Sequence, residues 1–163
     1  MTWQEYAQNL AASGLKPPEI NFLERVFNFT KKIHEGERRL SGEPFFDHPV
    51  AVSLQLLKLN LGTASVAAGL LHDAAERDST ALKTIRKDFG EEVAFLVDGV
   101  TKVDKVEARG AERALESMRK MFLAVAEDIR VVIIKLVRWN NFSWNHWFRH
   151  KLWHALHLDK FNN

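Results

Sequence analysis

The stretch Gly69-Leu70-Leu71-His72-Asp73-Ala74-Ala75-Glu76-Arg77 sets a His-Asp pair within an apolar helical run. Imidazole nitrogens and carboxylate oxygens both coordinate divalent cations. Glu76 follows one helical turn later, so its carboxylate can face the same side of the helix and polarise a metal-bound water. The run therefore predicts a metal site. For the dipeptide alone, a hydrogen-bonded structural pair is the alternative.

His48 is the best upstream candidate for a further ligand. It precedes Pro49 at the start of a second apolar run, Val50–Leu59. Proline is favoured at the first position of a helix, so we expect His48 at or near the N-cap, where its ring can point toward a neighbouring element. Together with the His-Asp pair and Glu76, it would form a hydrolase core.

Helical periodicity dominates the chain, and the alternation typical of strands is scarce. The expected breaks fall at glycine and proline, including Gly36 and the run Gly42–Pro44. Asn60-Leu61-Gly62-Thr63 supplies a stop and then an N-cap for the helix that carries His72. The predicted helices cover residues 3–13, 18–34, 49–60, 63–77, 80–89, 91–103, 112–127 and 128–138. The sequence therefore predicts an all-α fold.

The composition is typical of one soluble globular domain. Of the 163 residues, 46% are hydrophobic and 27% are charged, which is enough to bury a core. The net charge of +2 does not indicate a nucleic-acid-binding surface. The lack of cysteine excludes disulfides, thiolate metal sites and cysteine nucleophiles. With no signal-like leader and no apolar run of roughly 20 residues, we expect a cytoplasmic protein without a membrane or nucleic-acid partner.

Several separate motifs between about residues 25 and 136 occur in the order found in a known family. They are HEGERRLSGEPFFDHP at 34–49, LLHDAAE at 70–76, DFG at 88–90, GVTK at 99–102, and MRKM at 118–121 up to DIRV at 128–131. Together they resemble the HD hydrolase domain of the Rel/Spo family, which makes and destroys the guanosine alarmones (p)ppGpp. The resemblance implies an all-α HD-domain helical bundle.

The same resemblance implies roles for the residues of the predicted metal site. His48, His72 and Asp73 match three of the family's four manganese ligands, so Mn²⁺ is the implied cofactor. Glu76 matches the first carboxylate of the family's His-Asp-x-x-Glu-Asp motif and is the implied catalytic residue. The implied partner is a guanosine alarmone or another guanine nucleotide.

A second set of residues is implied for nucleotide binding. Arg39 matches the arginine that stacks on the guanine base, a contact that a planar guanidinium makes with a purine face. Ser41 falls in the same nucleotide-binding loop. Asn141 matches the family's asparagine when the last motif is aligned with one residue deleted. Without the resemblance, Arg38 and Arg39 would be interpreted as a solvated pair of loop arginines.

The chain departs from the family pattern next to the predicted metal. Where the family has Glu-Asp, this chain has Glu76-Arg77. Where the family has Lys-Leu-Ala-Asp-Arg-x-His-Asn, this chain has Lys-Leu-Val-Arg-Trp-Asn-Asn at residues 135–141. The fourth ligand, an aspartate, is missing. In an alignment without a gap, Arg138 takes the place of this aspartate. In an alignment with one residue deleted, Arg138 matches the family's arginine and the aspartate is simply absent. The formal charge of the side chains around the predicted metal changes from about −4 in the family to nearly zero here. In addition, Arg77 follows Asp73 by four residues, a spacing that favours an ion pair on a helix.

The segment from Trp139 to Asn163 differs in composition from the domain that we assign to residues 1–138. It holds four of the five tryptophans and four of the seven histidines. The histidines recur at helical spacing, at His146, His150, His154 and His157. A substitute metal ligand from this stripe is one hypothesis, and an aromatic helix packed over the core or against another subunit is the other. The tryptophans favour burial in an interface, and hence a homo-oligomer.

Three functional hypotheses remain. The leading one is a degenerate (p)ppGpp hydrolase-like protein with lost or strongly reduced activity, in which Arg39 and Ser41 can still bind a guanine nucleotide. The second is an active Mn²⁺-dependent (p)ppGpp 3′-pyrophosphohydrolase, whose metal is held by His48, His72 and Asp73 with a substitute group or water. The third is a structural or interaction module that self-associates through its aromatic segment.

Overall fold

The chain is a bundle of α-helices in a computed structural model that describes residues 1–39, 42–77, 80–104, 119, 122–123 and 126–141. The helices are α1 (Trp3–Ala12), α2 (Pro17–Ile33), α3 (Asp47–Lys58), α4 (Thr63–Leu71), α5 (Ala74–Arg77), α6 (Ala81–Phe89) and α7 (Glu91–Asp104). Residues 129–141 are also helical. The described residues contain no strand, only an isolated bridge between Arg38 and Pro44. The predicted all-α fold is therefore confirmed.

One predicted helix is divided in two. Residues 63–77 were expected to form a single helix, but α4 ends at Leu71 and α5 begins at Ala74, with a turn at His72 and Asp73. The Nδ1 atom of His72 lies 2.8 Å from the carbonyl oxygen of Gly69. A side chain bonded to a nearby backbone carbonyl offers that carbonyl an alternative to the helical ladder. The helical periodicity gave no sign of this competition.

The other predicted helix boundaries agree with α1, α2, α3, α6 and α7 to within two residues. The predicted helix at 112–127 lies mostly outside the described residues. The last helix was predicted to end at residue 138, but it continues to residue 141. The continuation carries Asn141 into a buried position, with 6% of its surface exposed.

Helix α4 lies at the centre of the bundle and packs against α2, α3 and α7. Its residues from Ser65 to Leu71 are all buried. Gly69 permits the close approach of α3, because a Cβ atom there would lie 2.5 Å from Leu56 Cδ1 and 3.3 Å from Ser53 Cα. The small residue thus lets the end of α4 pack closely against the second half of α3.

An aromatic cluster fixes the start of α3 against the first two helices. The ring of Tyr6 stacks on Phe27 at 5.2 Å, and Phe27 meets Phe46 edge-on at 4.9 Å. The hydroxyl of Tyr6 also donates a buried hydrogen bond of 3.0 Å to Ser53 Oγ on α3. Helix α3 begins directly after Phe46, so the cluster sets where the first turn of that helix lies.

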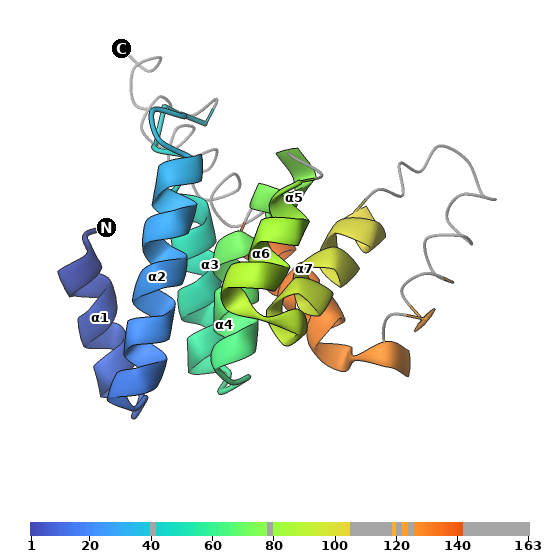
Figure 1. The fold of residues 1–163 in the computed structure, drawn as a ribbon, viewed down its shortest axis with the longest axis horizontal. Helices are drawn as coiled ribbons and strands as arrows, with labels where there is room; N and C mark the ends of the chain where they lie inside the picture. The colour runs from blue at the N-terminus through green and yellow to red at the C-terminus, as the bar shows by residue number, and fades with distance from the viewer. Residues whose placement is uncertain (40–41, 78–79, 105–118, 120–121, 124–125, 142–163) are drawn as a thin grey trace, which may run out of the picture.

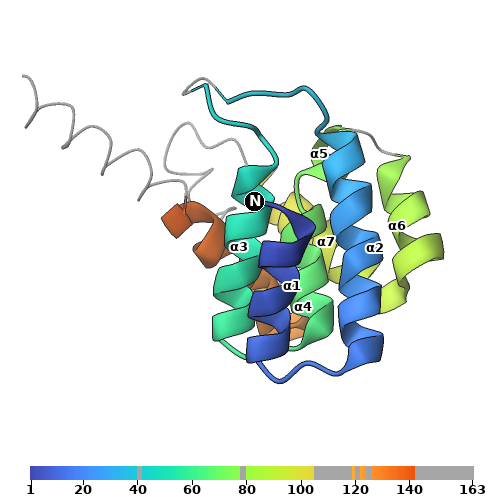
Figure 2. The same ribbon diagram turned by 90° about the vertical axis from the view of Figure 1, so that its left-hand side faces the viewer.

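The loop between α2 and α3 lies at the same end of the bundle as α5 (Figure 1), and it crosses that end when seen from the side (Figure 2). Backbone hydrogen bonds hold the loop in a hairpin-like shape. Arg39 N donates to Glu43 O and Phe45 N donates to Glu37 O, both at 2.9 Å. The described parts of the loop are thus held together by backbone hydrogen bonds at the end of the bundle where α3 begins.

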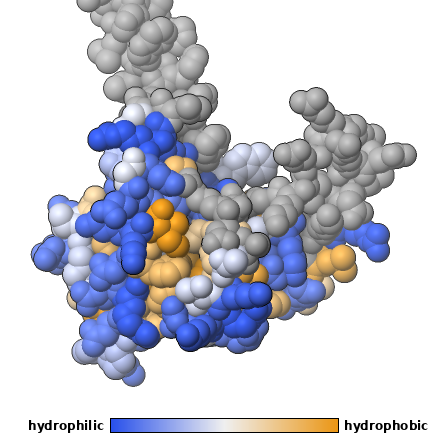
Figure 3. Space-filling view, turned by 45° about the horizontal axis from the view of Figure 1, so that its top comes forward, coloured by the Kyte–Doolittle hydropathy of each residue, from blue (hydrophilic) through white to orange (hydrophobic). Residues whose placement is uncertain are grey.

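The face seen in Figure 3 combines hydrophilic side chains with apolar side chains that gather in smaller patches. On the 129–141 helix, Ile129, Leu136 and Trp139 are at least half exposed. No helix in the described part of the chain combines the length and the apolar character that a membrane crossing requires.

Candidate metal centre

Three potential ligands meet where α3 begins and α4 ends. His48 lies in the first turn of α3, and His72 and Asp73 form the turn between α4 and α5. All three residues are buried, and one ligand atom of each lies within 4.8 Å of the others. The two imidazole rings are 5.3 Å apart at an angle of 78°. The structure thus brings together the three residues that the sequence selected as ligands.

The hydrogen bond from His72 to Gly69 determines which ring nitrogen is left to bind a cation. A carbonyl oxygen only accepts, so Nδ1 of His72, 2.8 Å from Gly69 O, carries a proton. Nε2 then points at Asp73 Oδ1, 2.9 Å away. In the neutral ring this is a lone pair facing a carboxylate oxygen. Only a proton or a cation between the two atoms makes that arrangement favourable.

Three buried polar atoms of the centre have no hydrogen-bond partner among the described residues. They are His48 Nδ1, His72 Nε2 and Asp73 Oδ2. A buried polar atom without a partner costs about 1–3 kcal/mol, so three in one place call for a common ligand. Two imidazole nitrogens and a carboxylate oxygen are donors that divalent transition-metal ions accept. The residues present therefore fit a divalent cation.

The protonation states of the centre also suit a cation. Burial, with a smaller contribution from the charge of His72, lowers the pKa of His48 to about 3. Burial alone would raise the pKa of Asp73, but His72 and then Arg138 outweigh it and hold this pKa below its usual range. Near neutral pH, His48 is thus neutral and Asp73 is ionised, which are the forms that bind metals.

Arg138 brings a positive charge into the same centre from the 129–141 helix. Its Nη2 atom lies 3.5 Å from Asp73 Oδ1, and 22% of its side chain is exposed. A guanidinium is always charged and matches the geometry of a carboxylate. Arg138 therefore shares with any cation the one described carboxylate of the centre.

Two of the predicted nucleotide-binding residues lie on elements next to the centre. Arg39 is half-buried in the α2–α3 loop, and its charge is among those that lower the pKa of His48. Asn141 is buried at the end of the helix that carries Arg138. The charge of Arg39 thus acts on the candidate metal centre, and Asn141 lies on the helix that brings Arg138 to it, but the contact of either residue with a nucleotide stays a prediction.

Other predicted site residues lie outside what the structure describes. Glu76 belongs to α5, but its side chain is not among the described parts, and the same holds for Arg77. Ser41 and the tail histidines also fall outside the described residues. The catalytic role of Glu76, the pairing of Arg77 with Asp73 and the substitute ligand from the tail stay predictions.

No role for Gly69 was predicted from the sequence. This residue supplies the carbonyl that orients His72, and its lack of a side chain lets α3 approach. A signal was present, because a glycine inside an apolar helix costs stability and usually has a packing reason. The hydrogen bond could not be foreseen, since helical periodicity does not show whether the ring of His72 bonds to a carbonyl three residues earlier.

Comparison with known proteins assigns the family. The model of the HD domain matches residues 27–139. A GTP pyrophosphokinase of Streptomyces coelicolor is 46% identical over 114 residues, which cover 70% of this chain and 13% of that protein. A guanosine-3′,5′-bis(diphosphate) 3′-pyrophosphohydrolase of Vibrio cholerae is 41% identical over 130 residues, 79% of this chain and 18% of that protein.

The bifunctional (p)ppGpp synthase/hydrolase SpoT of Escherichia coli is 38% identical over 133 residues, 81% of this chain and 19% of that protein. The chain thus spans less than a fifth of the length of these relatives. The matched regions include His48, His72 and Asp73 within the HD domain. The chain belongs to the HD domain family, in the Rel/Spo group that its separate motifs predicted.

Proposed function

We propose that this chain is a degenerate (p)ppGpp hydrolase-like domain in which metal-dependent hydrolysis is lost or strongly reduced. The observation that carries the proposal is the contact between Arg138 and Asp73, with Nη2 at 3.5 Å from Oδ1. The guanidinium thus contacts the same carboxylate that a cation would need as a ligand. The contact also agrees with the alignment in which Arg138 takes the place of the missing aspartate.

The charges around the centre oppose a divalent cation. His48 and His72 donate as neutral groups, so Asp73 is the only described ligand that offsets the two positive charges of the ion. Arg138 adds a further positive charge beside them. At an effective dielectric constant of about 20, such a repulsion costs on the order of a few kcal/mol. This corresponds to a loss of roughly 100-fold in affinity.

Weak cation binding would remove the basis of hydrolysis. In this chemistry a bound divalent cation lowers the pKa of the attacking water. His48, His72 and Asp73 are the residues that would hold it, and Glu76 would aim the water by its resemblance to the family. A centre that rarely holds the cation is rarely competent, whatever the position of Glu76.

The test replaces the opposing charge. Arg138→Asp should raise the affinity for Mn²⁺ by about tenfold or more, a change at least as large as those seen when residues around a metal site are altered. Lys83→Asp is the matched control, since it makes a positive-to-negative change on the exposed side of α6 and should leave the affinity unchanged. Calorimetric titration with Mn²⁺ measures both. Turnover of ppGpp by the unaltered chain on the order of 1 per second would contradict the proposal.

The unsatisfied buried atoms favour one alternative, an active Mn²⁺-dependent (p)ppGpp 3′-pyrophosphohydrolase. His48 Nδ1, His72 Nε2 and Asp73 Oδ2 are already oriented in a small space. If Arg138 swings aside when a cation binds, water can complete the ligand set. In that case the unaltered chain binds Mn²⁺ and hydrolyses ppGpp, and His72→Ala abolishes both.

Guanine-nucleotide binding is the part of the proposal that does not need the metal. The charge of Arg39, which contributes to lowering the pKa of His48, supports it, since a base stacked on this guanidinium would bring its phosphates toward the centre. Arg39→Ala should weaken binding of ppGpp, whereas Arg25→Ala, a change of an exposed arginine on α2, should not. Calorimetry with ppGpp, GDP and GTP measures this. No heat from any of the three at about 1 mM would refute it.

Self-association is supported by the apolar side chains of the last described helix. Ile129, Leu136 and Trp139 are 51%, 50% and 66% exposed, and the aromatic segment 142–163 follows them in the sequence. Large apolar side chains of this kind favour an interface. Light scattering should show an oligomer for the full chain and a weaker oligomer or a monomer after truncation at Arg138, which removes Trp139 and the aromatic segment. Protonation of the tail histidines at about pH 5.5 should weaken the oligomer. A full-chain monomer at both pH 8 and pH 5.5 would exclude it.

A further inference from the structure

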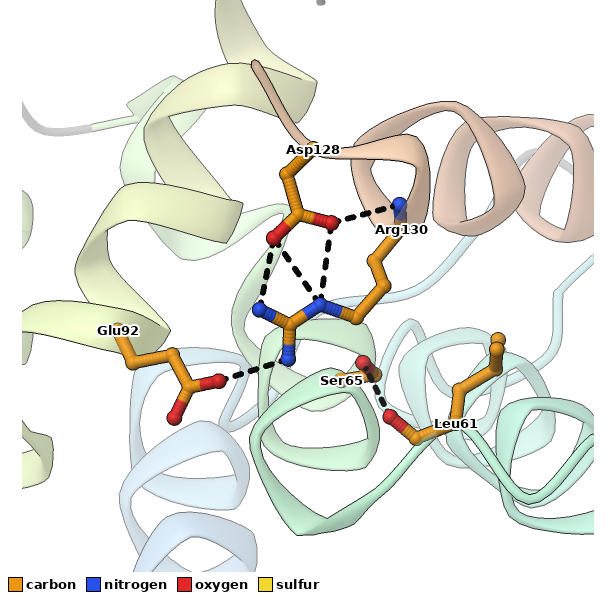
Figure 4. Close-up of polar contacts among 5 residues, drawn as sticks. All are labelled: Leu61, Ser65, Glu92, Asp128 and Arg130. Atoms are coloured by element: carbon orange, nitrogen blue, oxygen red, sulfur yellow. Dashed lines mark hydrogen bonds and ion pairs between the residues drawn. The ribbon is translucent and has the colours of Figure 1, made fainter. Parts of the chain in front are cut away.

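A second polar cluster lies where the 129–141 helix meets α7 (Figure 4). The guanidinium of Arg130 donates to Asp128 Oδ2 through Nε at 3.0 Å and Nη2 at 2.7 Å, and to Glu92 Oε1 through Nη1 at 2.7 Å. The backbone N–H of Arg130 donates to Asp128 Oδ1 at 2.9 Å, so Asp128 also caps the helix. One arginine thus joins the start of this helix to the first turn of α7.

The same end of the helix packs tightly on α7. A Cβ atom at Gly99 would lie 2.8 Å from Val131 Cγ2. Next to this contact, the guanidinium makes charge-assisted bonds whose geometry is directional. Glu92 is 59% exposed, so its ion pair contributes little to stability. The larger effect of the cluster is on the orientation of the helix.

The orientation of this helix decides where Arg138 lies. Eight residues separate Arg130 from Arg138, which is about 12 Å along a helix. A tilt of about 10° around Arg130 would therefore displace position 138 by about 2 Å. The contact of Arg138 with Asp73 is 3.5 Å long, so a displacement of this size is enough to break it.

We infer that Arg130, held by Asp128 and Glu92, is a positioning residue that sets the contact of Arg138 with Asp73 and thereby the cation affinity of the metal centre. The inference rests on the proposed function, in which Arg138 opposes the cation. Removing Glu92 frees one side of the guanidinium, loosens the helix and weakens the contact between Arg138 and Asp73. The affinity for a divalent cation then rises, although the changed residue is not one of the ligands.

The test compares two adjacent glutamates in the full chain. Glu91 and Glu92 both lie in the first turn of α7, so they share the favourable interaction with the helix dipole. Glu91, however, accepts a bond of 2.8 Å from Arg86 Nε. Glu92→Ala should shift the NMR signal of the Arg138 side-chain Nε–H and raise the affinity for Mn²⁺ alone by about threefold or more. Glu91→Ala should do neither.

A second background shows whether the effect passes through Arg138. In a chain with Arg138→Ala, adding Glu92→Ala should change the affinity for Mn²⁺ by less than about 1.5-fold. An equal change in both backgrounds, no rise in affinity, or an unchanged Arg138 signal would overturn the inference. The NMR signal also separates the two proposals. If Arg138→Asp leaves Mn²⁺ binding unchanged, the proposed function fails, yet the signal still reports whether Glu92 positions Arg138.

Discussion

The two polar clusters of this chain differ in how their atoms are satisfied. At the metal centre, His72 and Asp73 are buried and leave polar atoms without a hydrogen-bond partner among the described residues. At the other cluster, Arg130 is partly exposed and bonded to both Asp128 and Glu92. Buried polar groups without partners indicate a missing ligand, whereas satisfied groups at the surface indicate a structural role. The first cluster is therefore a candidate binding site, whereas the second joins two helices of the same domain.

The largest expected effect belongs to the metal centre, where the buried His48 makes the free energy of unfolding depend on pH. The unfolded chain binds a proton at His48 near pH 6.5, but the folded chain binds it only near pH 3. Between these values the unfolded state holds more protons, so stability is full above pH 6.5 and falls, by up to several kcal/mol, as the pH decreases.

His48→Asn should flatten this part of the stability curve. Urea unfolding of both chains between pH 7 and pH 4, in the presence of a chelator, measures the difference. Equal slopes for the two chains would show that His48 is protonated as easily in the folded state as in the unfolded one. The burial argument for the metal centre would then fail.

The next largest effect compares the two glycines that allow close packing. A Cβ atom at Gly69 would lie 3.3 Å from the backbone of Ser53, whereas the three atoms nearest to one at Gly99 all belong to the side chain of Val131. A backbone yields less easily than a side chain, so Gly69→Ala should cost about 2–3 kcal/mol and Gly99→Ala about 1 kcal/mol. Denaturant midpoints measure both. A larger cost for Gly99→Ala would reverse the proposed order.

The smallest effect concerns Asp128. The hydrogen bond from Arg130 outweighs burial and holds the pKa of Asp128 below its usual value of 3.8. The stability that this carboxylate contributes is therefore complete above pH 3.8 and is lost as the pH falls through the lower, folded-state pKa. Asp128→Ala should cost about 1 kcal/mol at pH 7, the usual cost of a lost helix cap.

Thermal unfolding at pH 7 and pH 3 provides the measurement for Asp128. The loss relative to the unaltered chain should shrink at pH 3, because this pH lies below the unfolded-state pKa of 3.8 and the stability that the ionised carboxylate contributes is then being lost. Asp88→Ala, a change of an exposed aspartate near the end of α6, serves as the control and should show little effect at either pH. An equal loss from both substitutions would remove the special role of Asp128.

Most helices and the three potential ligands could be predicted from the sequence, because each depends only on a local pattern of residues. The turn at His72 did not, because it depends on a side chain that bonds to the carbonyl of Gly69. The pairing of Arg130 with Glu92 was missed for another reason. The two residues lie 38 positions apart, and only the packed helices bring them together. Local patterns thus predict elements and candidate ligands, but not the contacts that orient them.

The hydrogen bond between Tyr6 and Ser53 bears on where this folding unit starts. The family model begins its match at residue 27, in the middle of α2. Tyr6 and Leu10 lie before that point and are fully buried, and Tyr6 is bonded to the helix that carries His48. An expression fragment cut to the matched region would leave Phe27 without its stacking partner and expose apolar surface. The packed core of this unit therefore extends before the region that the family model matches.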